Sequence, residues 1–565
     1  MSLTATLSLA SRSLDLFSLG IQVAGHNIAN ASTPGYVRDQ LQIETSAPYQ
    51  MGPLSIGTGA TAVGIRQQWD AYLEERIYAA HADAEAALLR KHAWQDIEQI
   101  MQDLQGQGVQ QRLTDLLAAV HNLTLDPQQS GLRTQLIQQG QALARDVQLI
   151  RSRLEDSRRS YSQQIEGLLN ETNALLRSIR DLNDQIVRLE SNGLAQNDAG
   201  PLRVQRLNAL QRLAEIVPIR VVENAAGAVD IYTGNDYLLL GGTLQQLTTA
   251  GLADDQGQSK VVIQLSQTKS ELQPSAGKLG GWLESRDRIL STFIEQFDQF
   301  VQQFVWEWNR VYSQGEGISG YTRITSQRAV DDGSIPLAQA GLPGQLQSGS
   351  VTVKLRNLNT GLTTSHRIVI TAAGHSSDTT LTDLQTQLDA VDHLSAIITS
   401  DGRLQLQTDD GYELRFGEDT SGVWAALGLN VFFVGDTSSD VEVLPALITH
   451  PEWVATGRGG GYADQTNLLE IAQILDRPLH LPDRRSLKEW YQQIVGQVAQ
   501  GGAAETSLAT GFENFRQSLL AQREQNSGVN LDEEAIRVMQ FQHNYKAAAR
   551  IISTIDQLLD VLLNI

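Results

Sequence analysis

Residues 3–36 read LTATLSLASRSLDLFSLGIQVAGHNIANASTPGY. Apolar side chains recur in this stretch at alternating steps of four and three, the spacing of one stripe along a helix and of a coiled-coil seam. The stripe consists of Leu3, Leu7, Ala10, Leu14, Phe17, Ile21, Ala24 and Ile28. It stops before Thr33-Pro34-Gly35-Tyr36, because proline cannot continue a helix and Pro-Gly is the central pair of a type II turn. We therefore predict an N-terminal seam helix that ends at this turn.

The C-terminal stretch repeats this spacing almost to the end of the sequence. Its stripe consists of Val538, Phe541, Tyr545, Ala548, Ile552, Ile555, Leu559 and Leu562. Asn530 can cap the helix with Glu533 three residues later, and the acidic residues 532–534 suit the positive end of the helix dipole. A second seam helix is predicted here.

The interior changes its periodicity along the chain. An amphipathic pattern from Trp69 to Leu104 and proline-free heptads over 131–192 predict long helices. Near Val217 the period becomes two, which predicts strands to about residue 270. Helical periodicity returns at 279–311, and the Gly-, Ser-, Thr- and Asp-rich residues 315–461 alternate as strands do.

These patterns predict a nested, multidomain α+β fold with both chain ends on one side. Terminal coiled-coil helices flank a long-helix bundle, which carries an inserted β-rich domain. The predicted domains are 1–36 with 530–565 for the terminal coiled coil, 37–315 with 462–529 for the bundle including a small β-rich element at 216–275, and 316–461 for the outer β-rich insert.

The composition argues against several classes of function. The 565 residues include 43 basic and 64 acidic side chains, for a formal charge of −21, so we expect neither nucleic-acid binding nor attraction to anionic membranes. No run approaches the roughly 18 apolar residues that span a bilayer, and no membrane insertion is predicted. The chain has no cysteine, which excludes disulfides and thiolate metal sites.

Signatures of catalysis are equally absent from the sequence. No two of the ten histidines have the i, i+4 spacing of a helical zinc site, and no phosphate-binding loop or G-x-S-x-G elbow occurs. The adjacent acids Asp409-Asp410 and Glu418-Asp419 fit solvated turns better than a glycosidase pair. We therefore predict no catalytic residue, no metal, no cofactor and no enzyme activity.

The apolar side chains of the two terminal stripes need more cover than one chain provides. Each stripe carries modest apolar side chains, and contact with the opposite end alone would cover one face of each helix incompletely. Ordering the backbone costs about 1 to 2 kcal/mol per residue, which favours helices that become ordered when several copies assemble. The predicted assembly residues are Leu3, Leu7, Leu14, Phe17, Ile21, Ile28, Val538, Phe541, Tyr545, Ile552, Ile555, Leu559 and Leu562.

Both ends also carry a motif that resembles a known family. Asn27-Ile28-Ala29-Asn30-Ala31-Ser32-Thr33-Pro34-Gly35-Tyr36 and Ser527-Gly528-Val529-Asn530-Leu531-Asp532-Glu533-Glu534 resemble the N- and C-terminal signatures of bacterial flagellar rod, hook and hook-associated proteins. The motif residues are Asn27, Asn30, Thr33, Pro34, Gly35, Tyr36, Ser527, Gly528, Asn530, Leu531, Asp532 and Glu533.

The resemblance implies a structural component of the flagellum, exported without a cleaved signal peptide through the flagellar type III apparatus and placed outside the cell. The helical region 69–189 favours a protein that joins hook to filament over a hook or distal rod protein. Implied partners are further copies of the chain, the hook protein, the second hook–filament junction protein and an export chaperone. An exported enzyme or effector carried by 316–461 is a further alternative.

If the ends order only on assembly, limited proteolysis of the monomer should cut near Tyr36 and Asn526 while the interior resists. Mass spectrometry of the fragments would locate the cuts. Equal protection of the ends and the interior would contradict coupled ordering.

Overall fold

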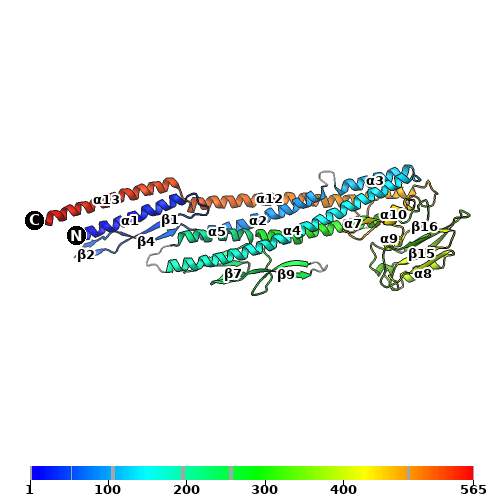
Figure 1. Ribbon diagram of the computed structural model, residues 1–565, viewed down its shortest axis with the longest axis horizontal. Helices are drawn as coiled ribbons and strands as arrows, with labels where there is room; N and C mark the ends of the chain where they lie inside the picture. Colours follow the sequence, from blue (N-terminus) through cyan, green and yellow to red (C-terminus); the bar gives the residue numbers. More distant parts are fainter. Residues whose placement is uncertain are drawn as a thin grey trace. The chain divides into compact units, whose positions relative to one another are not determined.

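The chain divides into two compact units. A computed structural model describes residues 3–51, 54–102, 108–191, 198–253, 259–479 and 484–563 (Figure 1). The first unit comprises residues 1–92, 160–286 and 503–565, and the second comprises 93–159 and 287–502. Within the first unit the two chain ends lie at the same end, as predicted (Figure 1).

Helices dominate the fold, and three of them contribute residues to both units. Helices α2, α4 and α12 cross the division between the units. The helices are α1 (Leu3–Asn30), α2 (Ala71–Met101), α3 (Val109–Leu125), α4 (Ser130–Ser191), α5 (Gly200–Ile216), α6 (Gly277–Glu284), α7 (Ser291–Tyr312), α8 (Leu381–Asp389), α9 (Val423–Leu427), α10 (Pro445–Thr449), α11 (Thr466–Ala472), α12 (Leu487–Ser527) and α13 (Leu531–Leu563). A π-helical turn, Ser285–Leu290, joins α6 to α7, and 3-10 turns occupy Leu337–Gln339 and Pro451–Trp453.

The strands form small antiparallel sheets. They are β1 (Asp39–Thr45), β2 (Tyr49–Met51), β3 (Leu54–Ile56), β4 (Ala60–Gln67), β5 (Arg220–Glu223), β6 (Val229–Thr233), β7 (Asp236–Leu240), β8 (Thr243–Leu244), β9 (Leu247–Ala253), β10 (Ser259–Leu265), β11 (Arg323–Thr325), β12 (Gly349–Asn357), β13 (Thr363–Ile370), β14 (Leu394–Ile398), β15 (Leu404–Thr408), β16 (Tyr412–Asp419), β17 (Phe433–Val434) and β18 (Glu442–Val443). The pairs are β1-β4, β2-β3, β9-β10 and β17-β18; the larger sheets run β5-β6-β7-β8, β13-β12-β16 and β11-β15-β14. The predicted mixed α+β class is confirmed.

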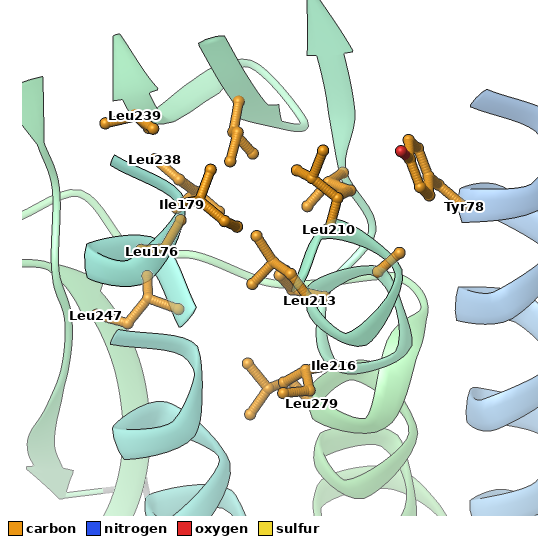
Figure 2. Packing of buried hydrophobic residues seen from close by; sticks show 14 of the residues in the cluster. Tyr78, Leu176, Ile179, Leu210, Leu213, Ile216, Leu238, Leu239, Leu247 and Leu279 are labelled. Carbon is orange, nitrogen blue, oxygen red and sulfur yellow. The ribbon is translucent and has the colours of Figure 1, made fainter. Parts of the chain in front are cut away.

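The core of the first unit packs two helices against small sheets. Figure 2 shows Leu176 and Ile179 of α4 beside Leu213 of α5, with Leu239 of β7 and Leu247 of β9 covering them. The unbroken α4 confirms the proline-free pattern, with Leu176 and Ile179 fully buried. Leu189, in the last turn of α4, is 63% exposed.

Two asparagines of α4 fasten the helix to strand backbones. Asn183 Nδ2 donates to the Val229 carbonyl at 2.9 Å, and its Oδ1 accepts from the Val229 N–H at 3.2 Å. Asn173 makes the same pair of bonds with Leu247, at 2.8 and 2.9 Å. Because a side-chain amide carries both a donor and an acceptor, it satisfies both groups of one backbone residue.

The second unit joins the insert to helices through buried polar side chains. The Arg133 side chain of α4 is 1% exposed and donates to the Val454 carbonyl at 2.6 Å and to Thr456 Oγ1 at 3.1 Å. Asn309 of α7 is 2% exposed; its Oδ1 accepts from the Phe432 and Phe433 N–H groups at 3.1 Å, and its Nδ2 donates to the Phe433 carbonyl at 2.7 Å.

The substitution Asn309→Ala should lower the free energy of unfolding of the second unit by about 1–3 kcal/mol, because it leaves buried backbone groups without partners. Urea unfolding and hydrogen exchange at Phe432 and Phe433 would measure the effect. Asn122→Ala, at an exposed position of α3, serves as the control, and an equal loss in both variants would contradict this role of Asn309.

Candidate assembly site at the paired chain ends

The two terminal helices lie side by side and run antiparallel (Figure 1). Asn27 of α1 contacts Glu534 near the start of α13, while Gly20 lies against Phe541 further along that helix. A Cβ at Gly20 would lie 2.8 Å from the Phe541 ring. The absence of a side chain at Gly20 therefore permits this close approach of the two helices.

The two sequence motifs meet where the helices begin and end. We call Asn27, Tyr36, Arg38, Asp39 and Glu534 the motif cluster. Asn27 is 1% exposed, and its Oδ1 accepts from Tyr36 Oη at 2.9 Å and the Asp39 N–H at 3.0 Å. Its Nδ2 donates to the Asp39 carbonyl at 2.9 Å and to Glu534 Oε2 at 3.3 Å. The amide is thus fully used, and neither a carboxylate nor an apolar side chain could replace both functions.

Glu534 joins α13 to the strand after the N-terminal motif. Its side chain is 1% exposed, and Oε1 lies 3.2 Å from Arg38 Nε and 3.2 Å from Arg537 Nη1. Arg38 Nη1 also lies 3.3 Å from Glu533 Oε2, and the Arg38 N–H donates to the Ser527 carbonyl at 3.0 Å. A buried carboxylate needs such compensation, because its charge is costly away from water.

The turn at the end of α1 is the predicted type II turn. The Tyr36 N–H donates to the Thr33 carbonyl at 3.1 Å, and Gly35 has φ +73°. The Thr33 N–H donates to the Asn30 carbonyl at 2.9 Å. A Cβ at Gly35 would lie 2.0 Å from Asn208 Oδ1, so conformation and space both require glycine. Pro34 is exposed.

The start of α13 is capped as predicted by Asn530. Its Oδ1 accepts from the Asp532 N–H at 3.0 Å and the Glu533 N–H at 3.3 Å. The Gly528 N–H donates to the Glu524 carbonyl at 3.0 Å, closing the preceding helix. Leu531 is 54% exposed and Asp532 is exposed. The cap therefore orients α13 while leaving its first turn partly open.

Burial shifts the pKa of two groups in the motif cluster. It raises the pKa of the Asp39 carboxyl, an effect opposed by His26, whose Nδ1 lies 3.3 Å from Asp39 Oδ2. Burial also raises the pKa of the Tyr36 hydroxyl, and the nearby Asp39 charge adds to the shift. Tyr36 therefore stays protonated and donates to Asn27.

The predicted assembly residues of α1 are only partly covered. Leu3, Leu7, Leu14, Phe17 and Ile21 are half-buried, and Ile28 is exposed. The buried residues of α1 are Ala10, Leu16, Gly20, Val23, Ala24 and Asn27. The covered face is thus displaced from the predicted stripe, because β1 and β4 pack on α1 as well as α13.

The predicted residues of α13 mostly face α1. Ile555 is buried, and Val538, Phe541, Ile552 and Leu559 are half-buried. Tyr545 is 40% exposed. The side chain of Leu562 and residues 564–565 lie outside the described residues.

Another face of α13 is apolar and exposed. We call it the outer face; it consists of Ile536, Met539, Ile551, Leu558 and Val561, which are 48–60% exposed. Ile536, Met539 and Val561 lie on the opposite side of α13 from Glu534 and Phe541, whereas Ile551 and Leu558 flank the buried Ile555, four and three residues from it. The five side chains form two groups, at 536–539 and 551–561, and exposed apolar side chains grouped in this way mark interaction surfaces in soluble proteins.

Some residues of the site escaped prediction from the sequence. Arg38, Asp39, Asn208 and Arg537 lie outside the motif residues, and for Glu534 the sequence indicates a place in the C-terminal motif and a helix-dipole role but not its buried contacts. A charged pair directly after the turn, Arg38-Asp39, was the available signal. Within the described ranges no helix is long and apolar enough to cross a membrane, and no three or more His, Asp or Glu side chains are grouped to hold a metal ion.

Comparison with known families identifies the class of protein. A family model for the flagellar hook-associated protein FlgK helical domain matches residues 94–324, and one for the flagellar basal body rod FlgEFG protein C-terminal region matches 521–565. The fold with its paired ends is therefore that of a structural protein of the flagellar rod, hook and hook-associated class.

Relatives narrow this class to one family. The chain is 23% identical to flagellar hook-associated protein 1 of Escherichia coli over 100% of both chains, and 21% identical to that of Bacillus subtilis over 99% of this chain and 97% of the relative. The structure of the flagellar hook junction protein FlgK from Burkholderia pseudomallei shares the fold, with a TM-score of 0.50 and 12% identity over 80% of this chain and 99% of that one. Over its full length the chain is thus similar to the flagellar hook-associated protein 1 family.

The substitution Asn27→Ala should weaken the pairing of α1 with α13, because the Asp39 backbone and Glu534 lose buried partners. We expect the free energy of local opening at α1 to fall by about 1–3 kcal/mol, measured by hydrogen exchange. The control is Asn30→Ala, at a half-buried position where Nδ2 donates to the nearby His26 carbonyl and Oδ1 accepts from Thr33 Oγ1 at 3.5 Å. The role of Asn27 would be refuted by equal effects of the two substitutions.

Folding raises the pKa of the Asp39 carboxyl above its value in the unfolded chain, which is about 3.9. The carboxyl therefore contributes fully to the free energy of unfolding below about pH 3.9, and this contribution is lost as the pH rises through the pKa of the folded state. Asp39→Asn should therefore gain stability relative to the parent as the pH rises from about 4 to 7. Urea unfolding across this range, with exposed Asp184→Asn as control, measures the difference. A constant difference would contradict the assignment.

Proposed function

We propose that this protein performs its structural role at the hook–filament junction by burying the outer face of α13 against further copies of itself. The carrying observation is that outer face: Ile536, Met539, Ile551, Leu558 and Val561 remain about half exposed although α13 is already paired with α1. Burial of this apolar surface between copies would stabilise the assembly by roughly 25 cal/mol for each Å² removed from water. Neighbouring copies would supply the cover that one chain lacks.

The motif cluster would fix the geometry of this assembly. It holds the start of α13 to Tyr36, Arg38 and Asp39 through buried hydrogen bonds and ion pairs. In each copy the outer face would therefore have a fixed orientation relative to the turn after α1. Ordering of the distal parts of both helices would accompany assembly, since their predicted seam residues are only half-buried in one chain.

We also propose binding partners and a location for the protein. The proposed partners are the hook protein, the second hook–filament junction protein and an export chaperone, besides further copies. The chain would leave the cell without a cleaved signal peptide and act outside it. The domains 1–36 with 530–565, 37–315 with 462–529, and 316–461 would be the assembling ends, the rigid bundle and the outward insert. No catalysis is proposed.

Electron microscopy of flagella from a strain without this gene, together with an assay for flagellin in the medium, tests the proposed function. Completed hooks without filaments, and flagellin lost to the medium, are the expected result. Truncated or absent hooks would instead place the protein in the rod or hook, and normal filaments would refute the proposal.

The outer face predicts a separation of assembly from folding. Leu558→Asp should abolish self-assembly and filament attachment while leaving the circular dichroism spectrum unchanged, because position 558 is 49% exposed in the single chain but would be buried between copies. Leu14→Asp and Ile552→Asp, at half-buried positions, should also abolish assembly.

The matched control for this experiment is Leu508→Asp, at a 47% exposed position of α12. It places the same charge on an equally exposed leucine of another helix. Wild-type assembly by Leu558→Asp, or equal loss in the control, would count against the outer face.

A further inference from the structure

A cavity of about 750 Å³ lies in the first unit, and Val37, between Tyr36 and Arg38 of the motif cluster, forms part of its wall. Its walls come from the end of β4, the start of α2, the helix α5 and the β5-β6 hairpin. This volume lies within the roughly 300–1,000 Å³ typical of ligand sites. The proposed assembly does not use the cavity.

The charged side chains around the cavity leave negative charge in excess. The lining contains the carboxylates of Glu74, Glu75, Glu190, Asp198 and Glu223 and the guanidinium groups of Arg66, Arg203 and Arg206. Behind the wall, Arg523 Nη1 lies 3.9 Å from Glu74 Oε1. Within the lining the carboxylates exceed the guanidinium groups by two, an excess of negative charge that a cation would reduce.

The two arginines of α5 that line the cavity are already bound to partners. Arg203 Nε lies 2.7 Å from Glu190 Oε1, and its Nη1 lies 2.8 Å from Glu223 Oε1. Arg206 Nη1 donates to Asn183 Oδ1 at 2.9 Å and to the Gly227 carbonyl at 2.6 Å. Donors committed in this way do not invite an anion.

Two buried oxygens at the start of α2 have no partner. Among the described residues, Glu74 Oε2 and Tyr78 Oη have no hydrogen-bond partner at normal distance and geometry, although the two residues are only 3% and 2% exposed. The donors of Gln211 and Arg523, which lie beside Glu74, are likewise without a partner at Gln211 Nε2 and Arg523 Nη1. Figure 2 shows the Tyr78 ring reaching from α2 toward the side of Leu210. Buried polar atoms without partners are costly, and both oxygens can accept from an N–H group.

The remaining walls suit an aliphatic stem. Val37, Leu207 and Leu210 contribute apolar surface, and Trp69, 43% exposed, belongs to the same lining. Long cationic side chains pack their methylene groups against such surface, and the face of a tryptophan attracts a cation.

We propose that this cavity is a binding site for a guanidinium or primary ammonium group carried on an aliphatic stem. The charged head donates to Glu74 Oε2 and Tyr78 Oη, and the stem lies along Leu207 and Leu210. Two sources offer this chemistry: an arginine or lysine side chain of a second copy of the chain, or a free alkylamine or alkylguanidine.

A comparison of butylguanidinium with butylurea tests the effect of charge alone, because the two molecules are nearly the same size and only the first is cationic. Isothermal titration calorimetry on the full chain should show saturable binding of butylguanidinium, at least tenfold tighter than that of butylurea. Glu74→Gln should weaken butylguanidinium at least tenfold, while Glu166→Gln, at an exposed position of α4, should leave it unchanged. No saturable binding, or equal binding of the two compounds, overturns the proposal.

Tyr78→Phe provides a second variant that does not depend on the folding of Glu74→Gln. Removal of a buried hydroxyl without a partner should raise the Tm of the free chain and weaken butylguanidinium binding severalfold. A lower Tm with unchanged binding would overturn the role of this hydroxyl and with it the proposed site.

Sedimentation of the concentrated chain distinguishes the sources. If a second copy supplies the side chain, saturating butylguanidinium should reduce self-association, whereas butylurea should not. If the ligand is a free amine or guanidine, self-association should be unchanged by either compound. The calorimetric result holds in both cases and does not depend on the junction role.

Discussion

A buried amide and a buried carboxylate from opposite ends of the chain satisfy each other in this protein. Asn27 and Glu534 are both 1% exposed, and neither could be buried at this site without the other end of the chain. Because a buried charge without compensation is strongly unfavourable, the position of α13 is tied to the turn after α1. Together with the ion pair of Arg38 and Glu534 and the packing of Gly20 on Phe541, this contact sets the helix pairing and the orientation of the outer face.

Periodicity in the sequence predicted much of the helical framework, for a physical reason. Both terminal helices and α4 carry apolar side chains at helical spacing over many turns, and proline or capping residues mark their ends. The turn at Pro34-Gly35 and the cap at Asn530 are local, so neighbouring residues suffice to predict them. The strands at 220–265 and in the insert followed from alternation and turn residues in the same way.

What escaped prediction depends on contacts distant in sequence. In β1 only Leu41 and Ile43 alternate with polar residues, and β4 mixes small and apolar residues, so the pattern in each strand is too short to predict it. The displaced covered face of α1 follows from these strands as well as from α13. Likewise Arg38 and Asp39 gain their roles only when Glu534 and Asn27 are brought to them, and a heptad pattern carries no information about such partners.

The separation along the chain between Asn27 and Glu534 has a consequence for the free ends. Their contact spans 507 residues, and the entropy lost on closing a flexible loop grows with its length. Until α13 reaches α1, the apolar side chains that the two helices bury against each other are exposed to other molecules.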